Sequence, residues 1–220
     1  PFATQDFIEL PSAANPTISM VPGDLANWKA VLPTLRRPGE AFRLSIKGDD
    51  RWGNPSNRFT GKIKLKTNLP VAGLAEIIDL KVGDFGVVIE GLSVESSGVL
   101  HLTVLDENDH LIATANPLVI RQTDAAHFWS DMHAQSGETI GVGTAREYFD
   151  FARNKAFLDI AGHQGNDFQI TDAFWQHLND LTAEYNEDNR FLTLPGYEWS
   201  GNTGLGGDHN VWFRDEGRPI

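Results

Sequence analysis

The chain has 220 residues, 40% of them apolar, and its 30 acidic and 18 basic side chains give a formal charge of −12. The apolar fraction is sufficient for a hydrophobic core, whereas the negative charge argues against nucleic-acid binding because it repels a phosphate backbone. Cysteine is absent, so disulfides and thiolate chemistry are excluded. The sequence has no apolar window of membrane-spanning length and no signal peptide at its first residue. It therefore predicts a soluble chain and leaves the compartment open.

Residues 30–121 show the pattern of short β-strands separated by turns. Apolar and polar residues alternate at 41–47 and at 62–66, which is the period of a half-buried strand. Runs rich in β-branched residues follow at 85–92, 99–105 and 111–120, with Gly, Asn, Asp and Ser between them. The size and pattern predict an immunoglobulin-like β-sandwich over residues 30–121, with residues 1–29 as an extended lead-in or linker.

Residues 122–220 show a different pattern, in which strands and helices alternate. Thr144 and Glu147 have the spacing of a capping box, which predicts a helix over residues 145–156. Thr171 or Asp172 is placed to cap a second helix. Strands are expected at residues 156–161, 191–197 and 210–213. This order is typical of an α/β domain with parallel strands.

Polar residues that can bind metal follow the expected strands at regular intervals. His133, His163 and Glu198 are separated by 30 and 35 residues, about one strand and one helix each. In an α/β barrel the carboxyl ends of the strands meet at one mouth, where catalytic groups collect. These three residues could therefore form one site, although an ordinary loop after each strand explains His133 and His163 equally well.

The neighbours of these residues extend the candidate set. Asp131 and Gln135 lie two residues either side of His133, and alternate residues of a strand share a face. Glu198 stands between Tyr197 and Trp199, where a carboxylate needs a partner such as a cation, a salt bridge or a backbone amide. A glycine-rich loop at 201–208 precedes His209. The loop lacks the Lys of a P-loop, and we interpret it as a lip of the site or as a long hairpin.

Three segments of the second half of the chain carry a family resemblance. The segments DMHAQSGETIG, FDFARNKAFLDIAGHQGND and LPGYEWSGNTGLGGDHNVWF resemble bacterial proteins of unknown function with a domain related to the PHP (polymerase and histidinol phosphatase) superfamily. His133 matches the first His of that superfamily's His-x-His motif, and Gln135 replaces the second. Glu198 matches its bridging Glu and His209 its later His. The Thr-Asp-His motif falls on Gln164-Gly165-Asn166, and His163 replaces its His only after a shift of register.

The resemblance implies a fold and an activity. Residues 122–220 would be the first part of a distorted β/α barrel, completed by further sequence or by a second fragment. The function would be metal-dependent hydrolysis of a phosphoester or related ester by a metal-activated water. The alternatives are a catalytically degenerate binding or scaffold protein, or a metal-assisted lyase. We expect a small anionic substrate and neither nucleic acid nor membrane as partner, and homo-oligomerisation is left open.

The roles that follow are expectations for individual residues. The expected ligands of a divalent zinc, manganese or iron ion are His133, His163, Glu198 and His209. Asp131, Gln135 and Glu138 are the catalytic candidates: Asp131 orients a ligand, and Glu138 acts as acid or base. Gln135, Asn166 and Asp167 are candidates for weak ligation or substrate contact, because amides are weaker ligands than imidazole or carboxylate.

Overall fold

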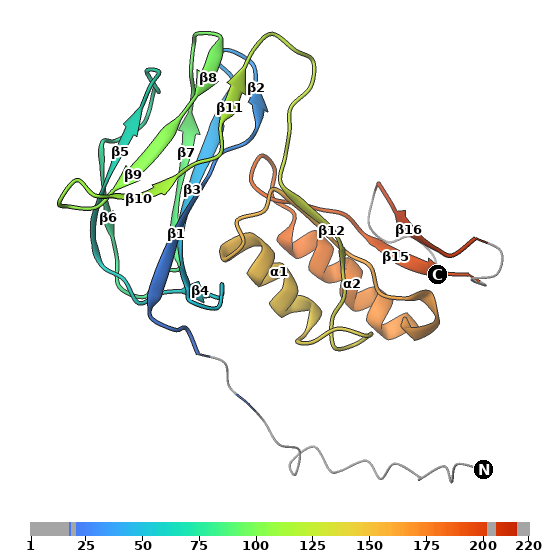
Figure 1. Ribbon diagram of the computed structural model, residues 1–220. Helices are drawn as coiled ribbons and strands as arrows, with labels where there is room; N and C mark the ends of the chain where they lie inside the picture. Colours follow the sequence, from blue (N-terminus) through green and yellow to red (C-terminus); the bar gives the residue numbers. More distant parts are fainter. Residues whose placement is uncertain (1–17, 19–20, 202–205, 215–220) are drawn as a thin grey trace.

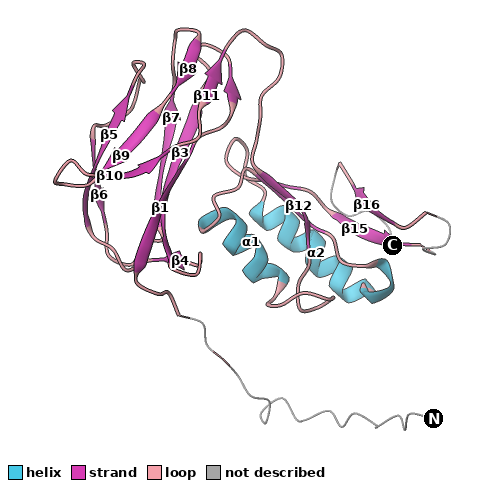
Figure 2. Cartoon of the chain, viewed as in Figure 1, coloured by secondary structure: helices cyan, strands magenta, loops and turns pink. Residues whose placement is uncertain are grey.

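The computed structural model describes residues 18, 21–201 and 206–214 and divides into two units (Figure 1). The sandwich contains strands β1 to β11, and the α/β unit contains strands β12 to β16 with both described helices (Figure 2). Of the sequence-based expectations, most of the lead-in and residues 202–205 of the glycine-rich loop lie outside the described residues.

The sandwich has two main sheets that are paired antiparallel throughout. One sheet places β3 between β1 and β7 and also pairs it with β4, and the other has the order β10-β9-β5-β6. A small third sheet has the order β2-β11-β8. The strands are β1 Leu25–Val31, β2 Leu35–Arg36, β3 Phe42–Asp50, β4 Pro55–Ser56, β5 Gly61–Thr67, β6 Ile77–Leu80, β7 Gly86–Leu92, β8 Gly98–Leu100, β9 Leu102–Leu105, β10 Leu111–Thr114 and β11 Leu118–Ile120.

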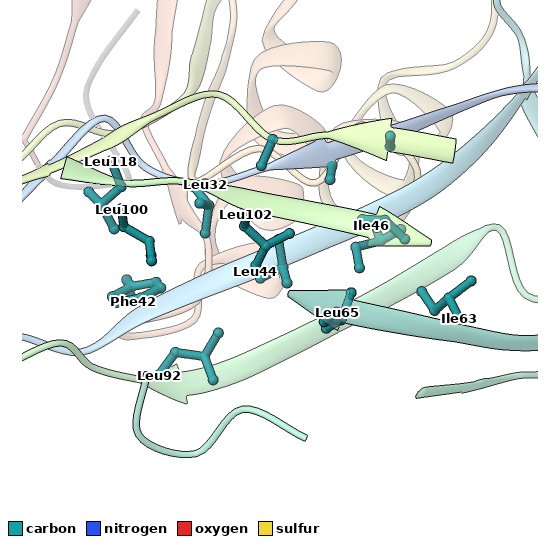
Figure 3. Close-up of a cluster of buried hydrophobic side chains, with 14 of the residues drawn as sticks. Leu32, Phe42, Leu44, Ile46, Ile63, Leu65, Leu92, Leu100, Leu102 and Leu118 are labelled. Carbon is teal, nitrogen blue, oxygen red and sulfur yellow. The ribbon is translucent and has the colours of Figure 1, made fainter. Parts of the chain in front are cut away.

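The core of the sandwich lies between these sheets. Leu44 and Ile46 of β3 lie among Leu65 of β5 and Leu102 of β9, all of them buried (Figure 3). Alternate residues of each strand supply this layer, as the sequence pattern predicts. The structure confirms the predicted immunoglobulin-like sandwich and begins it at β1, inside the segment expected to be a lead-in.

The α/β unit contains a three-stranded parallel sheet with the order β12-β13-β14. A separate antiparallel hairpin, β15 and β16, follows it. The described residues thus hold an open sheet and a hairpin, and the α/β barrel implied by the resemblance is not supported. The elements are β12 Ser130–Ala134, α1 Ala145–Asn154, β13 Ile160–His163, the 3₁₀ turn η2 Asp167–Gln169, α2 Asp172–Tyr185, β14 Leu192–Thr193, β15 Gly196–Ser200 and β16 Asp208–Trp212.

Side-chain caps set the starts of both helices. Thr144 accepts a hydrogen bond from the Glu147 amide, and the Glu147 side chain accepts one from the Thr144 amide, which completes the predicted capping box of α1. The Thr171 side chain caps α2 by accepting a hydrogen bond from the Phe174 amide. The strand expected at 156–161 begins only at Ile160, because Phe157 has a positive φ of 56°. Neither described helix is long and apolar enough to cross a membrane.

An arginine of the sandwich joins the two units. Arg43 of β3 forms an ion pair with Asp159, with 2.7 Å between Nη2 and Oδ1. Its guanidinium also donates to the backbone oxygens of Phe157, Leu158 and Arg190, at 2.9, 2.6 and 3.1 Å. These residues lie just before β13 and β14, so the sandwich holds the amino ends of the parallel strands.

Candidate functional site

The candidate site is centred on the carboxylate of Glu198, at the opposite ends of the same strands. Glu198 belongs to β15 and is only 8% exposed. Its backbone forms a parallel bridge with Asn166, and its amide donates to the Gly165 oxygen at 2.9 Å. The loop after β13 therefore positions β15, and with it the carboxylate, beside the end of β12.

Three side chains converge on one oxygen of this carboxylate. Oε2 of Glu198 lies 2.8 Å from Nδ2 of Asn166, 3.1 Å from Nε2 of Gln135 and 3.3 Å from Nε2 of His133. The two amides donate hydrogen bonds, which compensate the buried charge in the absence of Lys or Arg among its described partners. His133 is half exposed, so the group opens to solvent on the imidazole side.

Two hydroxyl groups that the sequence analysis did not select hold these amides in place. Thr139 donates to Oε1 of Gln135, and Nδ2 of Asn166 donates to Oγ of Ser200 at 2.9 Å. Ser200 lies two residues after Glu198 in β15, so alternation in that strand could have identified it. Thr139 lies in a loop, and the sequence carries no pattern that predicts its contact with Gln135.

A bulge in β12 separates Asp131 from this group. Asp131 pairs with Ala161 and Ala134 with His163, so three steps along β12 face two along β13. The bulge breaks the alternation that was expected to bring Asp131, His133 and Gln135 to one face. His133 and Gln135 both reach Glu198, whereas the Asp131 carboxylate accepts a hydrogen bond from the His133 amide at 3.2 Å.

His163 belongs to a second group of polar contacts and has no contact with Glu198 among those the structure describes. Its Nε2 lies 2.8 Å from Oγ of Ser136, and the Gly165 amide donates to its Nδ1 at 3.2 Å. The ring packs edge-on against Tyr148 and Phe174. Since Nδ1 accepts a hydrogen bond, the neutral ring carries its proton on Nε2 and donates to Ser136. Both ring nitrogens are therefore engaged, and His163 does not join the expected ligand set.

Burial keeps His163 neutral. The imidazole is 2% exposed, and desolvation lowers its pKa to about 4, against a small opposing effect of the Glu138 charge. Because Nε2 is a donor, His163 cannot take a proton from the Ser136 hydroxyl, and the pair is not a nucleophile and its base.

The carboxylates of Glu138 and Asp167 accept hydrogen bonds from backbone amides near the site. Glu138 accepts from the Ala145 amide at 3.2 Å, at the start of α1. Burial opposes its ionisation, but hydrogen bonds from Ser136 and from backbone amides outweigh that effect and lower the pKa of Glu138. Asp167 accepts from the amides of Phe168 and Ser200, at 2.8 and 3.2 Å. Neither carboxylate has a contact with Glu198 among those the structure describes.

The register of the hairpin places His209 on the other face. Glu198 pairs with Asn210, and Trp199 pairs with His209. Directly paired residues share a face, and neighbours along a strand alternate, so His209 faces away from Glu198. Its ring stacks on Trp199, with centroids 5.5 Å apart. The sequence placed His209 correctly at a strand start but could not give its register.

His133 and Glu198 together could provide part of a binding site for one divalent ion. Two ligands about 2.1 Å from a tetrahedral ion lie about 3.4 Å apart, close to the 3.3 Å between His133 Nε2 and Glu198 Oε2. Two ligands are fewer than the three that catalytic zinc sites use. Among the described residues, no group of three or more His, Asp or Glu side chains is arranged to hold one ion.

The family follows from comparison with known sequences. The model of the family described as "Protein of unknown function (DUF3604)" matches residues 101–220, more than half of the chain. The chain belongs to this family. The DUF3604 match begins inside the sandwich, next to β9, and runs through the whole candidate site.

The curated relatives are uncharacterized proteins of Chlamydia. A Chlamydia pneumoniae protein is 22% identical over 191 residues, which cover 84% of this chain and 30% of the relative. A Chlamydia trachomatis protein is 19% identical over 181 residues, covering 80% and 29%. The chain thus spans less than a third of the length of these relatives.

Two solved domains share partial similarity with the chain. The PKD domain of an M14-like peptidase from a Thermoplasmatales archaeon is 12% identical, with a TM-score of 0.30, and covers 46% of this chain and all of that domain. A CARDB domain from Pyrococcus furiosus is 14% identical, with a TM-score of 0.27, and covers 47% of this chain and all of that domain. Scores this low carry no argument about this chain.

Proposed function

We propose that this DUF3604 chain contributes to a metal-dependent hydrolase site of the PHP type that acts on a phosphoester or related ester. The observation that supports this most is the pair of His133 Nε2 and Glu198 Oε2, 3.3 Å apart at the carboxyl ends of the parallel strands. Imidazole and carboxylate are the ligand types that zinc, manganese and iron bind in such sites. The bound ion would supply an activated water and polarise the ester oxygen.

The residues of this chain would have separate tasks in that site. His133 and Glu198 would hold the ion. Asn166 and Gln135 position the carboxylate by hydrogen bonds at 2.8 and 3.1 Å, and their neutrality leaves its full negative charge for the cation. The exposed side of His133 would be the direction of substrate entry, since the other partners of Glu198 are buried or half-buried. Ligands beyond these two would come from outside this chain, which spans 30% of the length of its Chlamydia pneumoniae relative.

A matched pair of histidine variants tests the proposal. The protein is purified at its natural length, loaded with zinc or manganese and desalted, and its metal content is measured by mass spectrometry. His133→Ala and Glu198→Gln should lose the ion, whereas His209→Ala removes an imidazole from the other face and should retain it. Metal-dependent cleavage of p-nitrophenyl phosphate should follow the same order. Metal-free wild-type protein, or equal loss in all three variants, would reject the proposal.

One observation favours a second function, that of a binding protein without catalysis. Two amide groups already donate to one oxygen of the Glu198 carboxylate, in the way expected for a polar pocket that needs no metal. In that case the wild-type protein would neither retain metal nor cleave esters, and Glu198→Gln would change neither property. A metal-assisted lyase is the third alternative, and it would retain metal in the wild type without hydrolysing the ester.

A further inference from the structure

A cleft of about 710 Å³ lies between the sandwich and the α/β unit, at the amino ends of the parallel strands. Its walls include Arg36, Phe42 and Glu90 of the sandwich, and Asp188 and Phe191 from the segment before β14. The volume is in the range of small-molecule sites, and such sites often occur between domains. The cleft is distinct from the Glu198 group, which lies at the other end of the strands.

Arg36 provides a fixed hydrogen-bonding edge in this cleft. The side chain is only 6% exposed, and its guanidinium lies 4.8 Å from the ring centre of Phe128. Nη1 donates to the backbone oxygens of Leu35 and His127, both at 2.8 Å. Two backbone acceptors and an aromatic ring therefore fix the orientation of the guanidinium before any ligand arrives.

The other edge of this guanidinium is free. Within the described residues, Nε and Nη2 of Arg36 have no hydrogen-bond partner, and neither is a fully enclosed atom, so both meet the solvent of the cleft. These two nitrogens form the side-on fork that matches both oxygens of a carboxylate. Burial lowers the pKa of Arg36, with partial compensation from Glu40 and Asp159. An incoming anion would replace the hydration that this guanidinium has lost.

The remaining charges of the cleft define the rest of the ligand. Arg43 pairs with Asp159, Arg190 with Glu187, and Glu40 with Arg37 outside the cleft. The lining charges that have no ion pair among the described side chains are then one cation and two anions, namely Arg36, Glu90 and Asp188. A ligand that complements them carries one carboxylate and one or two amines. An anion alone would be repelled by the two free carboxylates.

We propose that this interdomain cleft binds a small zwitterion of the basic amino-acid type, whose carboxylate pairs with the free edge of Arg36. The amines face Glu90 and Asp188, which are exposed and contribute less than the buried guanidinium. The apolar part of the ligand lies along the exposed ring of Phe128 in the cleft wall. This cleft site does not depend on the proposed hydrolase function.

Calorimetric titration with four matched probes tests this site. L-Lysine carries every required group, L-norleucine lacks the side-chain amine, cadaverine lacks the carboxylate, and inorganic phosphate is an anion without an amine. L-Lysine should bind with a Kd below about 1 mM, L-norleucine more weakly, and cadaverine and phosphate weakest. Absence of heat with L-lysine, or binding of cadaverine or phosphate as tight as that of L-lysine, would overturn the proposal.

Variants of Arg36 and Glu90 test which side chain contacts the carboxylate of the ligand and which contacts its amine. Arg36→Lys keeps the charge and removes the fork, so L-lysine affinity should fall about tenfold or more, whereas Arg58→Lys on the sandwich surface should change nothing. Glu90 is assigned to the side-chain amine, so the surface change Glu90→Gln should weaken L-lysine several-fold and leave L-norleucine, which lacks that amine, unchanged. If Arg36→Lys does not fold, the Arg36 Nε–Hε signal of the wild-type protein decides, because it should shift on addition of L-lysine. An unshifted signal, or equal effects of Glu90→Gln on both amino acids, would refute the assignment.

Discussion

The buried imidazole of His163 should make the stability of this protein strongly pH-dependent between pH 7 and pH 5. Burial lowers its pKa to about 4, while the unfolded chain has an ordinary histidine pKa of about 6.5. The unfolded state therefore binds the proton more readily in this window, and stability falls as the pH decreases. Proton linkage lowers the free energy of unfolding by about 1 kcal/mol at pH 6 and by about 2 kcal/mol at pH 5, relative to pH 8.

The groups around His163 keep this effect separable. Tyr148, whose pKa is raised mainly by burial, stays neutral throughout the window, and Phe174 and Ser136 do not titrate. Glu138 has a lowered pKa, so its contribution is lost only below about pH 4.5. Protonation of His163 would also place a proton on Nδ1, where the Gly165 amide now donates. That change would disturb Gly165, whose backbone oxygen accepts a hydrogen bond from the Glu198 amide.

Urea unfolding followed by tryptophan fluorescence at pH 5, 6, 7 and 8 measures the effect. The wild-type protein should lose about 2 kcal/mol between pH 8 and pH 5 through His163, and His163→Gln should remove that part of the dependence. His209→Gln, which replaces an exposed histidine, should keep the wild-type slope. Equal slopes for wild type and His163→Gln would show that the imidazole is not held neutral by burial.

Three substitutions test the packing that positions the site. Thr144→Ala removes the capping box of α1 and should lower the free energy of unfolding by about 1 kcal/mol in urea. Phe149→Ala empties a fully buried position packed on Tyr185 and should cost about 3–5 kcal/mol in the same assay. Arg43→Met removes the ion pair with Asp159 and should cost about 2 kcal/mol; hydrogen exchange should increase before β13 and remain unchanged in the far sheet of the sandwich.

Local patterns in the sequence predicted the parts of the fold that depend on near neighbours. The alternating lysines at 62–66 predicted β5, and the Thr144 and Glu147 pair predicted the start of α1, because strand faces and helix caps are set within a few residues. The β-sandwich follows from a series of such strands. The barrel did not follow, because closure depends on strand partners that a local pattern does not specify.

Register limits what the sequence predicts about the site. Glu198 was selected because a carboxylate between two aromatics needs a partner, and the structure supplies His133 and two amides. Asp131 was selected from its spacing to His133, and His209 from the family resemblance and its place after the glycine-rich loop. A bulge in β12 moves the first away from Glu198, and the hairpin pairing turns the second to the opposite face. A shift of one residue reverses every side chain of a strand, and no residue near either position encodes it.

The two ends of the parallel sheet differ in what they contact. The amino ends of the strands pack against the sandwich, and the carboxyl ends lie next to the Glu198 group. At the amino ends, Arg43 holds Asp159, and the other oxygen of Asp159 accepts from the Trp129 amide at 2.8 Å. One ion pair thus fixes the starts of β12 and β13 relative to each other. These strands are only five and four residues long, so a displacement at their starts would reach His133 and the Asn166 loop almost undiminished. The sandwich therefore sets the relative position of the side chains that meet at Glu198 without contributing a side chain to that group.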